Sequence, residues 1–175
     1  SQFFNNRLTA TLAYYDITKS NVAEPIPGNP FYYQTIGLVG SRGFEFDIAG
    51  RIDEHWSVIG NYAYDDAKIL DDTNGNQGHR LANVPQNAGG IWIKYDADGS
   101  FKGLSLGGGV TVLGERQGDN TNDFELPAFA RVDAMIMYRL PRYLLDWGKN
   151  ATLQLNVKNV FDETYYLHSY DRFSI

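Results

Sequence analysis

The sequence of 175 residues predicts an all-β fold, in which an antiparallel up-and-down sheet forms a segment of a transmembrane β-barrel. Three observations lead to this prediction. Seven segments alternate apolar and polar residues with a period of two, the pattern of strands that have two different faces. The connections between them are alternately short and long, as in outer-membrane barrels. The alternating runs also reach the roughly nine to eleven residues that a tilted strand needs to cross the hydrocarbon core.

The first three expected strands occupy about residues 7–17, 41–52 and 56–67. In the first, leucine and alanine alternate with threonine. In the second, phenylalanine and isoleucine alternate with Glu45 and Asp47. The third keeps tryptophan, valine and tyrosine in one row, and Ile59 is an exception to it. Each segment therefore has one apolar and one polar face.

The remaining four expected strands occupy about residues 88–95, 104–116, 130–140 and 151–166. The first of these is ambiguous, because Trp92 falls opposite Ile91 and Ile93. The next two alternate cleanly. The last, ATLQLNVKNVFDETYY, alternates as far as Asn159, where the pattern fails, and a membrane-spanning run from Thr152 to Phe161 is expected in it.

The connections differ in length and composition. Residues 53–55 and 96–103 form short links, and 141–150 a modest one. The long, polar connections, rich in glycine, asparagine and aspartate, are 18–40, 68–87, 117–129 and the segment from 167 onward. Long loops at one end of the sheet and short ones at the other indicate a membrane barrel, whereas a soluble sandwich would show turns every 8–12 residues.

The polar rows carry ionic groups of both signs: Glu45, Asp47, Arg51, Glu115, Arg131, Asp133, Arg139 and Lys158. Facing a hydrated lumen, these groups could pair across strands. The alternative is that they form the solvated face of a soluble sheet. Aromatic residues near the expected strand ends favour the membrane, where they would form interfacial girdles: Tyr14, Tyr15, Trp56, Tyr62, Tyr64, Tyr95, Tyr138, Phe161, Tyr165 and Tyr166.

Composition excludes several other classes. The net charge of −6 and pI near 4.9 disfavour nucleic acid as a partner. Cysteine is absent, so the chain has neither a disulfide framework nor a thiolate metal site. No run of eighteen apolar residues predicts a transmembrane helix. The three histidines are scattered and form no catalytic pattern, so we do not expect an enzyme.

The stretch NVFDETYY (159–166) resembles the Asn-Leu-Phe-Asp-x-x-Tyr-Tyr signature near the C-terminus of TonB-dependent outer-membrane receptors, particularly those for ferric siderophores. Other stretches resemble the same family in the same order. They are RLTATLAYYDITKSNV (7–22), VGSRGFEFDIAGRI (39–52), WSVIGNYAYDDAKI (56–69), LANVPQNAGGIWIKY (81–95) and ARVDAMIMYRL (130–140). The resemblance thus covers nearly the whole chain.

This resemblance implies a 22-stranded barrel in the outer membrane of a Gram-negative bacterium, closed by an N-terminal plug. Such a barrel imports a ferric siderophore with energy from the TonB complex. Residues 1–175 are then expected to be the C-terminal portion of the barrel, with the plug and final strand absent. Expected partners are the rest of the same barrel, outer-membrane lipid, the chelate and, through the missing plug, the TonB complex. The alternative functions are a soluble, lectin-like binding module and a passive porin-type barrel.

The resemblance also implies that late-loop aromatic residues contact the chelate. Tyr170 and Phe173 are the candidates for stacking, or alternatively they only pack the loop. His168 and Arg172 are candidates for hydrogen bonds, and Arg116 and Gln117, at a strand top near the lumen, are weaker ones. Because iron arrives already chelated, we expect no protein metal ligands and no cofactor.

Overall fold

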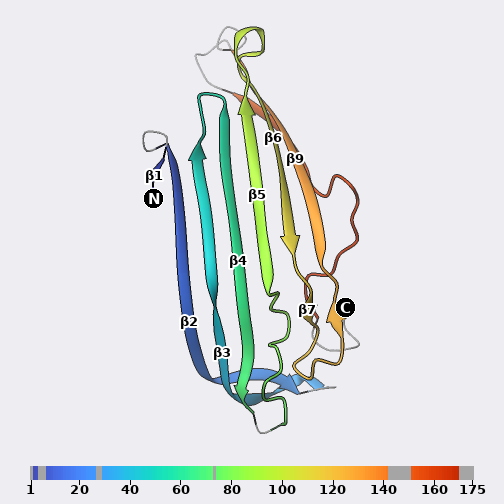
Figure 1. Cartoon of the computed structure of the whole chain (residues 1–175). Coiled ribbons are helices and arrows are strands. Elements are labelled where there is room, and N and C mark those ends of the chain that lie inside the picture. Colours follow the sequence, from blue (N-terminus) through green and yellow to red (C-terminus); the bar gives the residue numbers. More distant parts are fainter. Residues whose placement is uncertain (1, 4–6, 27–28, 73, 142–150, 170–175) are drawn as a thin grey trace.

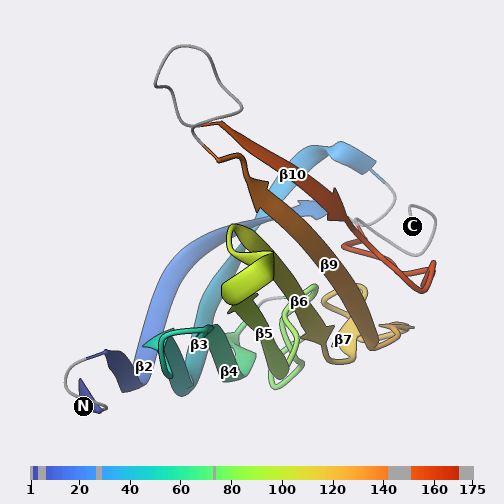
Figure 2. The same ribbon diagram turned by 90° about the horizontal axis from the view of Figure 1, so that it is seen from above.

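The computed structural model describes residues 2–3, 7–26, 29–72, 74–141 and 151–169, and there it forms an open, curved antiparallel sheet (Figures 1 and 2). The order of the large sheet is β1-β2-β3-β4-β5-β6-β9-β10, and β7 and β8 form a separate small pair. The strands are β1 (Gln2–Phe3), β2 (Leu8–Ile26), β3 (Asn29–Arg51), β4 (Trp56–Asp71), β5 (Asn87–Asp96), β6 (Leu104–Leu113), β7 (Arg116–Gln117), β8 (Glu125–Leu126), β9 (Phe129–Arg139) and β10 (Thr152–Val157). A single 3₁₀ turn, η1 (Gly99–Phe101), lies among the described residues. The predicted up-and-down, all-β fold is confirmed.

The prediction of a long loop at 18–40 was wrong. Strands β2 and β3 continue through this region as one long hairpin, in which Lys19 pairs with Val39 and Ala23 with Thr35. The two arms satisfy each other's backbone N–H and C=O groups, so a polar sequence can remain in strands. In Figure 1 their far ends bend across the end of the sheet where the other long loops lie.

The last strand is shorter than predicted. Strand β10 ends at Val157, and residues 158–169 form no strand, so the expected span from Thr152 to Phe161 was wrong. The cause is Asn159, which adopts a positive φ of 54° that asparagine tolerates and an extended strand does not. The failure of alternation at this residue therefore marks a turn.

The sheet has two chemically different faces, as the alternation predicted. The apolar face carries Leu12, Phe44, Tyr62, Ile93, Leu106, Ile136 and Leu155, which the register places on one side. On β10, Leu153, Leu155 and Val157 are 63%, 61% and 45% exposed, so no protein interior encloses them. The opposite side, called the polar face here, carries the ionic rows.

Ile59 and Trp92, the two exceptions to alternation, are cross-strand partners on the polar face. The Trp92 indole lies against Gly107 and Gly109 of β6, where an added Cβ would come within 2.9 Å and 2.5 Å of its ring atoms. The ambiguity of the fourth expected strand and the irregularity of the third thus have one cause. Together, Ile59 and Trp92 form an apolar patch on the otherwise polar face.

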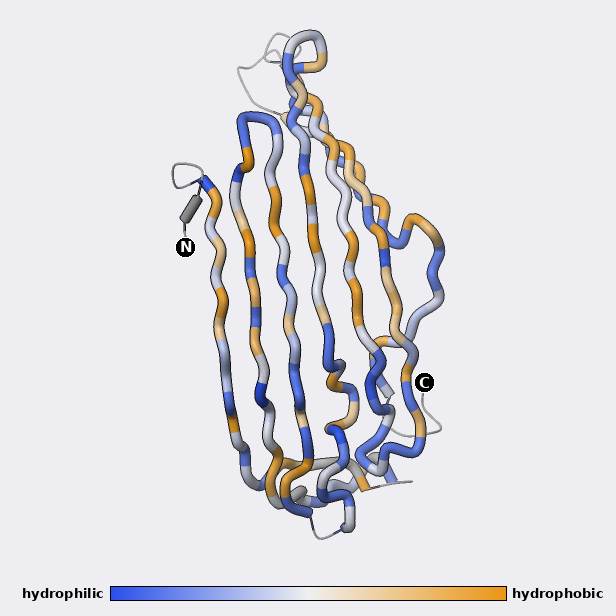
Figure 3. Tube along the Cα trace, in the orientation of Figure 1, coloured by the Kyte–Doolittle hydropathy of each residue, from blue (hydrophilic) through white to orange (hydrophobic). Residues whose placement is uncertain are grey.

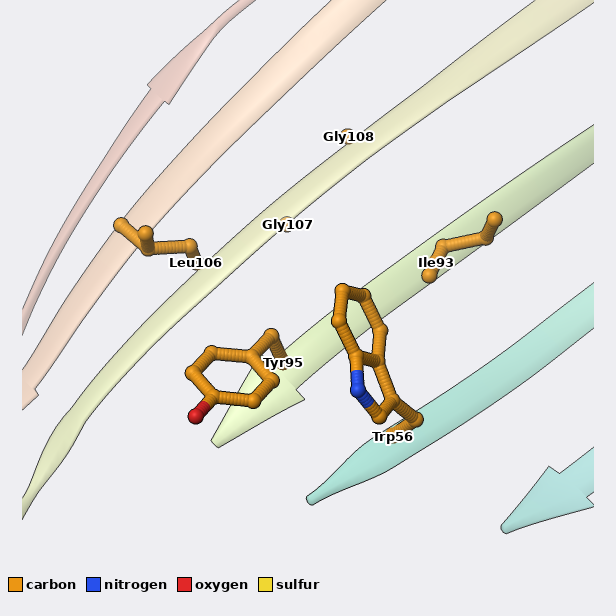
Figure 4. A pocket seen from close by; sticks show the side chains of 6 residues that line it. All are labelled: Trp56, Ile93, Tyr95, Leu106, Gly107 and Gly108. Atoms are coloured by element: carbon orange, nitrogen blue, oxygen red, sulfur yellow. The ribbon is translucent and has the colours of Figure 1, made fainter. Parts of the chain in front are cut away.

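Aromatic residues occupy both ends of the apolar face. At the short-turn end the Trp56 and Tyr95 rings lie 4.8 Å apart, beside Ile93 and Leu106 (Figure 4). Eight residues further along β4, Tyr64 stacks on Phe44 at 5.7 Å. At roughly 2.4 Å of rise per tilted residue, these rows lie about 20 Å apart, close to the height of a membrane-spanning apolar band.

Two residues expected in these aromatic rows lie elsewhere. The Tyr15 hydroxyl donates to the Tyr64 carbonyl from the polar face, where Tyr15 pairs with Gly43. Tyr165 stacks on Phe129, which lies on the polar face of β9. For Tyr15, residue parity within β2 decides the face. Tyr165 follows the last strand, and its contact with Phe129 places it on the polar face.

Buried side chains gather at the end of the sheet with the long loops. Val39 and Ile69 form a small cluster with Val22 and Leu81 packed against it. Figure 3 shows hydrophilic stretches near this end of β2, β3 and β4. No helix in the described part of the chain has the length and apolar character needed to cross a membrane.

Candidate functional site

Three chain segments that are far apart in sequence meet at the end of the sheet with the long loops. They are residues 72 and 74–87, 114–128 and 158–169, and together they are called the loop end here. Strand β7 pairs with β8 in this region, with Arg116 opposite Leu126 and Gln117 opposite Glu125. The loop end is the part of the described chain in which a ligand would meet fixed polar groups.

The first two segments are joined by asparagine side chains. Asn122 Oδ1 accepts from the Arg80 backbone N–H at 2.9 Å, and its Nδ2 donates to the Arg80 carbonyl at 2.9 Å. Asn120 Oδ1 accepts from the Ala82 N–H at 2.9 Å. The His79 ring Nδ1 lies 3.1 Å from the Asn120 carbonyl oxygen. These bonds replace the strand pairing that the loops lack.

The third segment is joined through Asn83. Its Nδ2 donates to the Ser169 carbonyl at 2.8 Å, and its Oδ1 accepts from the Ser169 N–H at 2.8 Å. The Asn83 backbone N–H donates to the Gln117 carbonyl at 2.8 Å. The buried Ser169 hydroxyl donates to the Gly118 carbonyl. One asparagine therefore ties all three segments together.

The family-like stretch NVFDETYY begins with a closed turn. Asn159 Oδ1 accepts from the Glu163 N–H at 2.9 Å, while its Nδ2 donates to the Glu163 carbonyl at 3.0 Å. The Asn159 backbone N–H donates to Asp133 Oδ1 at 2.8 Å, which fixes the turn to β9. Asp162 also has a positive φ, of 54°. Asparagine and aspartate suit these positions because they tolerate the left-handed region.

The same stretch ends in a ring that packs on the sheet. Tyr165 stacks on Phe129 with ring centroids 4.5 Å apart, and its hydroxyl accepts from Arg131 Nη1 at 3.3 Å. Arg131 also makes two hydrogen bonds to Asp133, at 3.1 Å and 2.9 Å. The stretch therefore has an architectural role, because it folds residues 159–169 back along β9.

Arg116 lies at the centre of the loop end and is only 1% exposed. Its Nη2 donates to the Tyr166 carbonyl, and its Nε and Nη1 have no partner within the described ranges. Burial lowers the pKa of Arg116. Leaving a buried polar group unpaired costs about 1–3 kcal/mol, so this guanidinium is a position where an acceptor from outside the described residues would be stabilising.

The structure places the sequence candidates differently. Gln117 is buried, and its Nε2 donates to Glu125 Oε1 at 2.7 Å. His168 lies on an exposed stretch next to buried Ser169. Tyr170, Arg172 and Phe173 lie outside the described residues. Of the six candidates, the structure thus brings Arg116 and Gln117 together, and both are anchored inside the loop end rather than lining an open strand top.

Sequence reasoning missed the asparagines that build the loop end. Asn83 and Asn122 adopt positive φ values of 63° and 57° and bond across segments. The available signal was the repeated occurrence of asparagine in long loops. Asparagine is common in any turn, however, so its spacing does not reveal partners that are about 40 to 86 residues away.

Comparison with known proteins places this geometry in a family. Residues 1–160 match the family model described as "TonB dependent receptor-like, beta-barrel". The chain is 40% identical over 169 residues to the metal-pseudopaline receptor CntO of Pseudomonas aeruginosa, covering 95% of this chain and 23% of that protein. It is 32% identical over 154 residues to the ferrioxamine receptor of Yersinia enterocolitica, covering 87% of this chain and 21% of that protein.

Solved structures agree with the sequence relatives. The siderophore receptor PiuA from Acinetobacter baumannii superimposes with a TM-score of 0.77 at 27% identity, over 97% of this chain and 24% of that chain. The chain therefore spans about a quarter of the length of each of these three relatives. The family match includes all the strands described above. The chain belongs to the TonB-dependent receptor β-barrel family, whose members lie in the outer membrane of Gram-negative bacteria.

Proposed function

We propose that the protein of which this chain is a part imports a ferric siderophore across the outer membrane. In this proposal the long strands form barrel wall, and the loop end forms part of the vestibule in which the chelate binds. The observation that carries it is the ordered loop end, in which three segments are fixed by side-chain hydrogen bonds at one end of a family barrel. A vestibule with fixed polar groups can orient a ligand before transport.

Family membership argues against the two alternative functions. A soluble, lectin-like module does not account for the exposed apolar rows of the sheet, whereas lipid contact does. A passive porin needs no TonB complex, the partner that gives this family its name. We propose that energy reaches the barrel through a plug outside this chain. The position of residues 1–175 in the C-terminal portion of the barrel stays a prediction.

We further propose that the protein is a receptor and transporter without catalytic activity. Iron enters as substrate, already chelated, so the wall and vestibule supply contacts to the organic shell rather than metal ligands. Tyr170 and Phe173 remain the proposed stacking residues, with His168 and Arg172 as hydrogen-bonding partners. Arg116 and Gln117 are proposed as positioning residues that do not touch the chelate. Both are buried in the part of the loop end that holds residues 166–169 in place.

Uptake of radiolabelled iron tests the proposal directly. The full-length receptor is produced in a Gram-negative strain that lacks its own siderophore receptors, with and without a functional TonB complex. Ferrioxamine B, ferrichrome and metal-pseudopaline complexes are supplied separately. We expect saturable uptake of at least one chelate that is lost without TonB. Uptake that is equal in both strains would identify a passive pore and overturn the proposal.

Binding measurements separate the vestibule from the wall. Tyr170→Ala and Phe173→Ala should weaken binding of the transported chelate while the barrel still assembles. Phe101→Ala is the matched control, because Phe101 is a 68% exposed aromatic residue in η1, at the opposite, short-turn end of the sheet. Unchanged affinity in both vestibule variants would show that the late-loop assignment is wrong.

A further inference from the structure

Asn74 and Gly75 form an exposed turn in the first segment of the loop end, shortly after strand β4. They are the only Asn-Gly pair in the sequence. An asparagine side chain reacts most readily with the backbone nitrogen of a following glycine, because glycine has no side chain to obstruct the approach. The import proposed above gives neither residue a role.

The backbone nitrogen of Gly75 is free to react. Its N–H has no acceptor among the described residues. A Cβ built on Gly75 would meet nothing within 4 Å, so the space around this residue is open. Its φ of 90° is one that glycine adopts without strain. A change of conformation at this peptide bond therefore displaces no neighbouring segment.

The neighbouring asparagine, Asn76, is placed very differently. The Asn74 side chain is exposed, and its Nδ2 donates to Asp72 Oδ1 at 3.0 Å. Asn76 is only 8% exposed, its Nδ2 donates to Asp72 Oδ2 at 2.9 Å, and it is followed by Gln77. The two asparagines share one acceptor carboxylate, but only Asn74 combines exposure with a following glycine.

We propose that Asn74 is a site of spontaneous covalent modification, at which the side chain is deamidated through a cyclic succinimide. The Gly75 nitrogen attacks Asn74 Cγ and forms a new N–C bond. The Cγ–Nδ2 bond breaks, and ammonia leaves with the proton from the Gly75 N–H. Water then opens the ring, at Cγ to give aspartate or at the main-chain carbonyl to give isoaspartate. Water is the only co-reactant, and no atom is oxidised or reduced.

The modification changes the contact between Asn74 and Asp72. Aspartate puts a carboxylate where the amide donates to Asp72, so two negative charges face each other in place of a hydrogen bond. Isoaspartate also adds a methylene group to the main chain of the turn. Asp72 holds Asn76, whose carbonyl accepts from the His79 N–H at 3.0 Å, and the His79 carbonyl accepts from the Ile69 N–H at 2.9 Å. Deamidation therefore loosens the turn that closes the first segment of the loop end onto β4.

Asp98 and Gly99 provide an internal comparison, because aspartate before glycine forms the same succinimide with loss of water. This pair is held at η1, where the Phe101 N–H donates to the Asp98 carbonyl at 3.0 Å and the Lys102 N–H to the Gly99 carbonyl at 3.3 Å. Ring closure rotates the peptide bond between Asp98 and Gly99 and disturbs both contacts. We therefore expect folding to protect Asp98 but not Asn74.

Peptide mapping of the aged full-length receptor tests the proposal. The receptor is kept at neutral pH, folded in detergent or unfolded in denaturant, and deamidation and isoaspartate are followed by mass spectrometry. We expect Asn74 to react several times faster than Asn76, at rates within a few-fold in the two states. Folding should suppress isoaspartate several-fold at Asp98. Strong suppression by folding at Asn74, or equal rates at Asn74 and Asn76, would overturn the proposal.

Two substitutions separate the reaction from its consequence. Asn74→Gln is the matched control, because it keeps an amide that can donate to Asp72 but closes a larger ring far more slowly. Asn74→Asp imitates one product. We expect hydrogen exchange at Asn76 and His79 to accelerate several-fold in Asn74→Asp and to stay as in wild type in Asn74→Gln. Equal exchange in the two variants would overturn the proposed loosening. None of these measurements depends on chelate transport.

Discussion

The sheet wall and the loop end are stabilised in different ways. On the wall, strands are joined by backbone ladders, and side chains such as Leu155 are exposed to whatever surrounds the sheet. At the loop end, Leu126 and Arg116 are almost completely buried, as is Ile69 where β4 reaches it, and side-chain hydrogen bonds join distant segments. The wall should therefore be sensitive to the spacing between backbones and tolerant of changes in side-chain size. The loop end should be sensitive to changes in its side chains and more tolerant of small changes in backbone spacing.

The largest effect is expected where two wall strands approach most closely. At Gly43 an added Cβ would lie 1.9 Å from the Tyr64 carbonyl oxygen on the neighbouring strand. Gly43→Ala must therefore separate β3 from β4, and lipid cannot satisfy the freed backbone groups. We expect the barrel to fail to assemble, as measured by loss of heat-modifiable migration.

Gly108→Ala is the control for this substitution. Its Cβ would meet nothing closer than the Asp133 carbonyl oxygen at 3.8 Å, so assembly should be normal. If Gly43→Ala assembled as well as Gly108→Ala, backbone spacing would not be what limits the wall.

The next largest effect separates the buried end of β4, next to the loop end, from the exposed part of the wall. Ile69→Ala removes a fully buried side chain from the cluster with Val39 and Leu81, and such truncations cost about 2–5 kcal/mol. Ile59→Ala removes the same atoms from a side chain that is 59% exposed in this sheet. We expect hydrogen exchange to accelerate across residues 67–82 in the first variant only. Equal acceleration in both would contradict the proposed difference between the two regions.

A smaller effect is expected from Asn83, which joins the three segments of the loop end. Its φ of 63° favours asparagine or glycine. Asn83→Gly keeps the backbone conformation and removes the bonds to Ser169, so it should loosen residues 166–169 by about 1–3 kcal/mol. Asn83→Ala adds backbone strain of roughly 1–2 kcal/mol. Limited proteolysis measures both, and similar cleavage of wild type and Asn83→Gly would show that the side chain does not join the segments.

The wall was predictable from sequence because its two faces contact different media. Period-two alternation therefore appears in the residues themselves, and the seven expected strands were found in the predicted order, the last one shorter than expected. The exceptions were equally informative. Ile59 and Trp92 broke the pattern separately in sequence, and pairing between β4 and β5 made them a single patch. Sequence shows that each residue is irregular, but only the register shows that they are partners.

The loop end could not be predicted in the same way. Its contacts join residues such as Asn83 and Ser169, which are 86 positions apart and have no periodic relation. Composition indicated long polar loops, but it gave no means of distinguishing a solvated loop from one whose asparagines replace strand pairing. The hairpin of β2 and β3 shows the same difficulty, because its polar arms resemble a loop until their mutual pairing is seen.

The smallest predicted effect is a loss of local stability at low pH. It is expected separately in the turn at Asp53, at one end of the sheet, and in the turn at Asp72, at the other. In the short turn, the backbone N–H groups of Trp56 and His55 donate to Asp53 Oδ1, each at 2.7 Å, and they lower the pKa of Asp53. At the loop end, burial acts to raise the pKa of Asp72, but hydrogen bonds from Asn74 and Asn76 outweigh it and lower that pKa.

A lowered folded-state pKa means that each carboxylate stabilises its turn above its unfolded pKa of about 3.9 and loses this contribution as pH falls through the folded pKa. We therefore expect the amides of His55, Trp56 and Asn76 to lose protection only below about pH 4, measured by hydrogen exchange corrected for intrinsic rates. Asp53→Asn should remove the pH dependence at His55 and Trp56 and leave that at Asn76 unchanged. Loss of the acid response at both ends in this single variant would show that the two ends are coupled through the wall, contrary to the independence expected for an open ladder of strands.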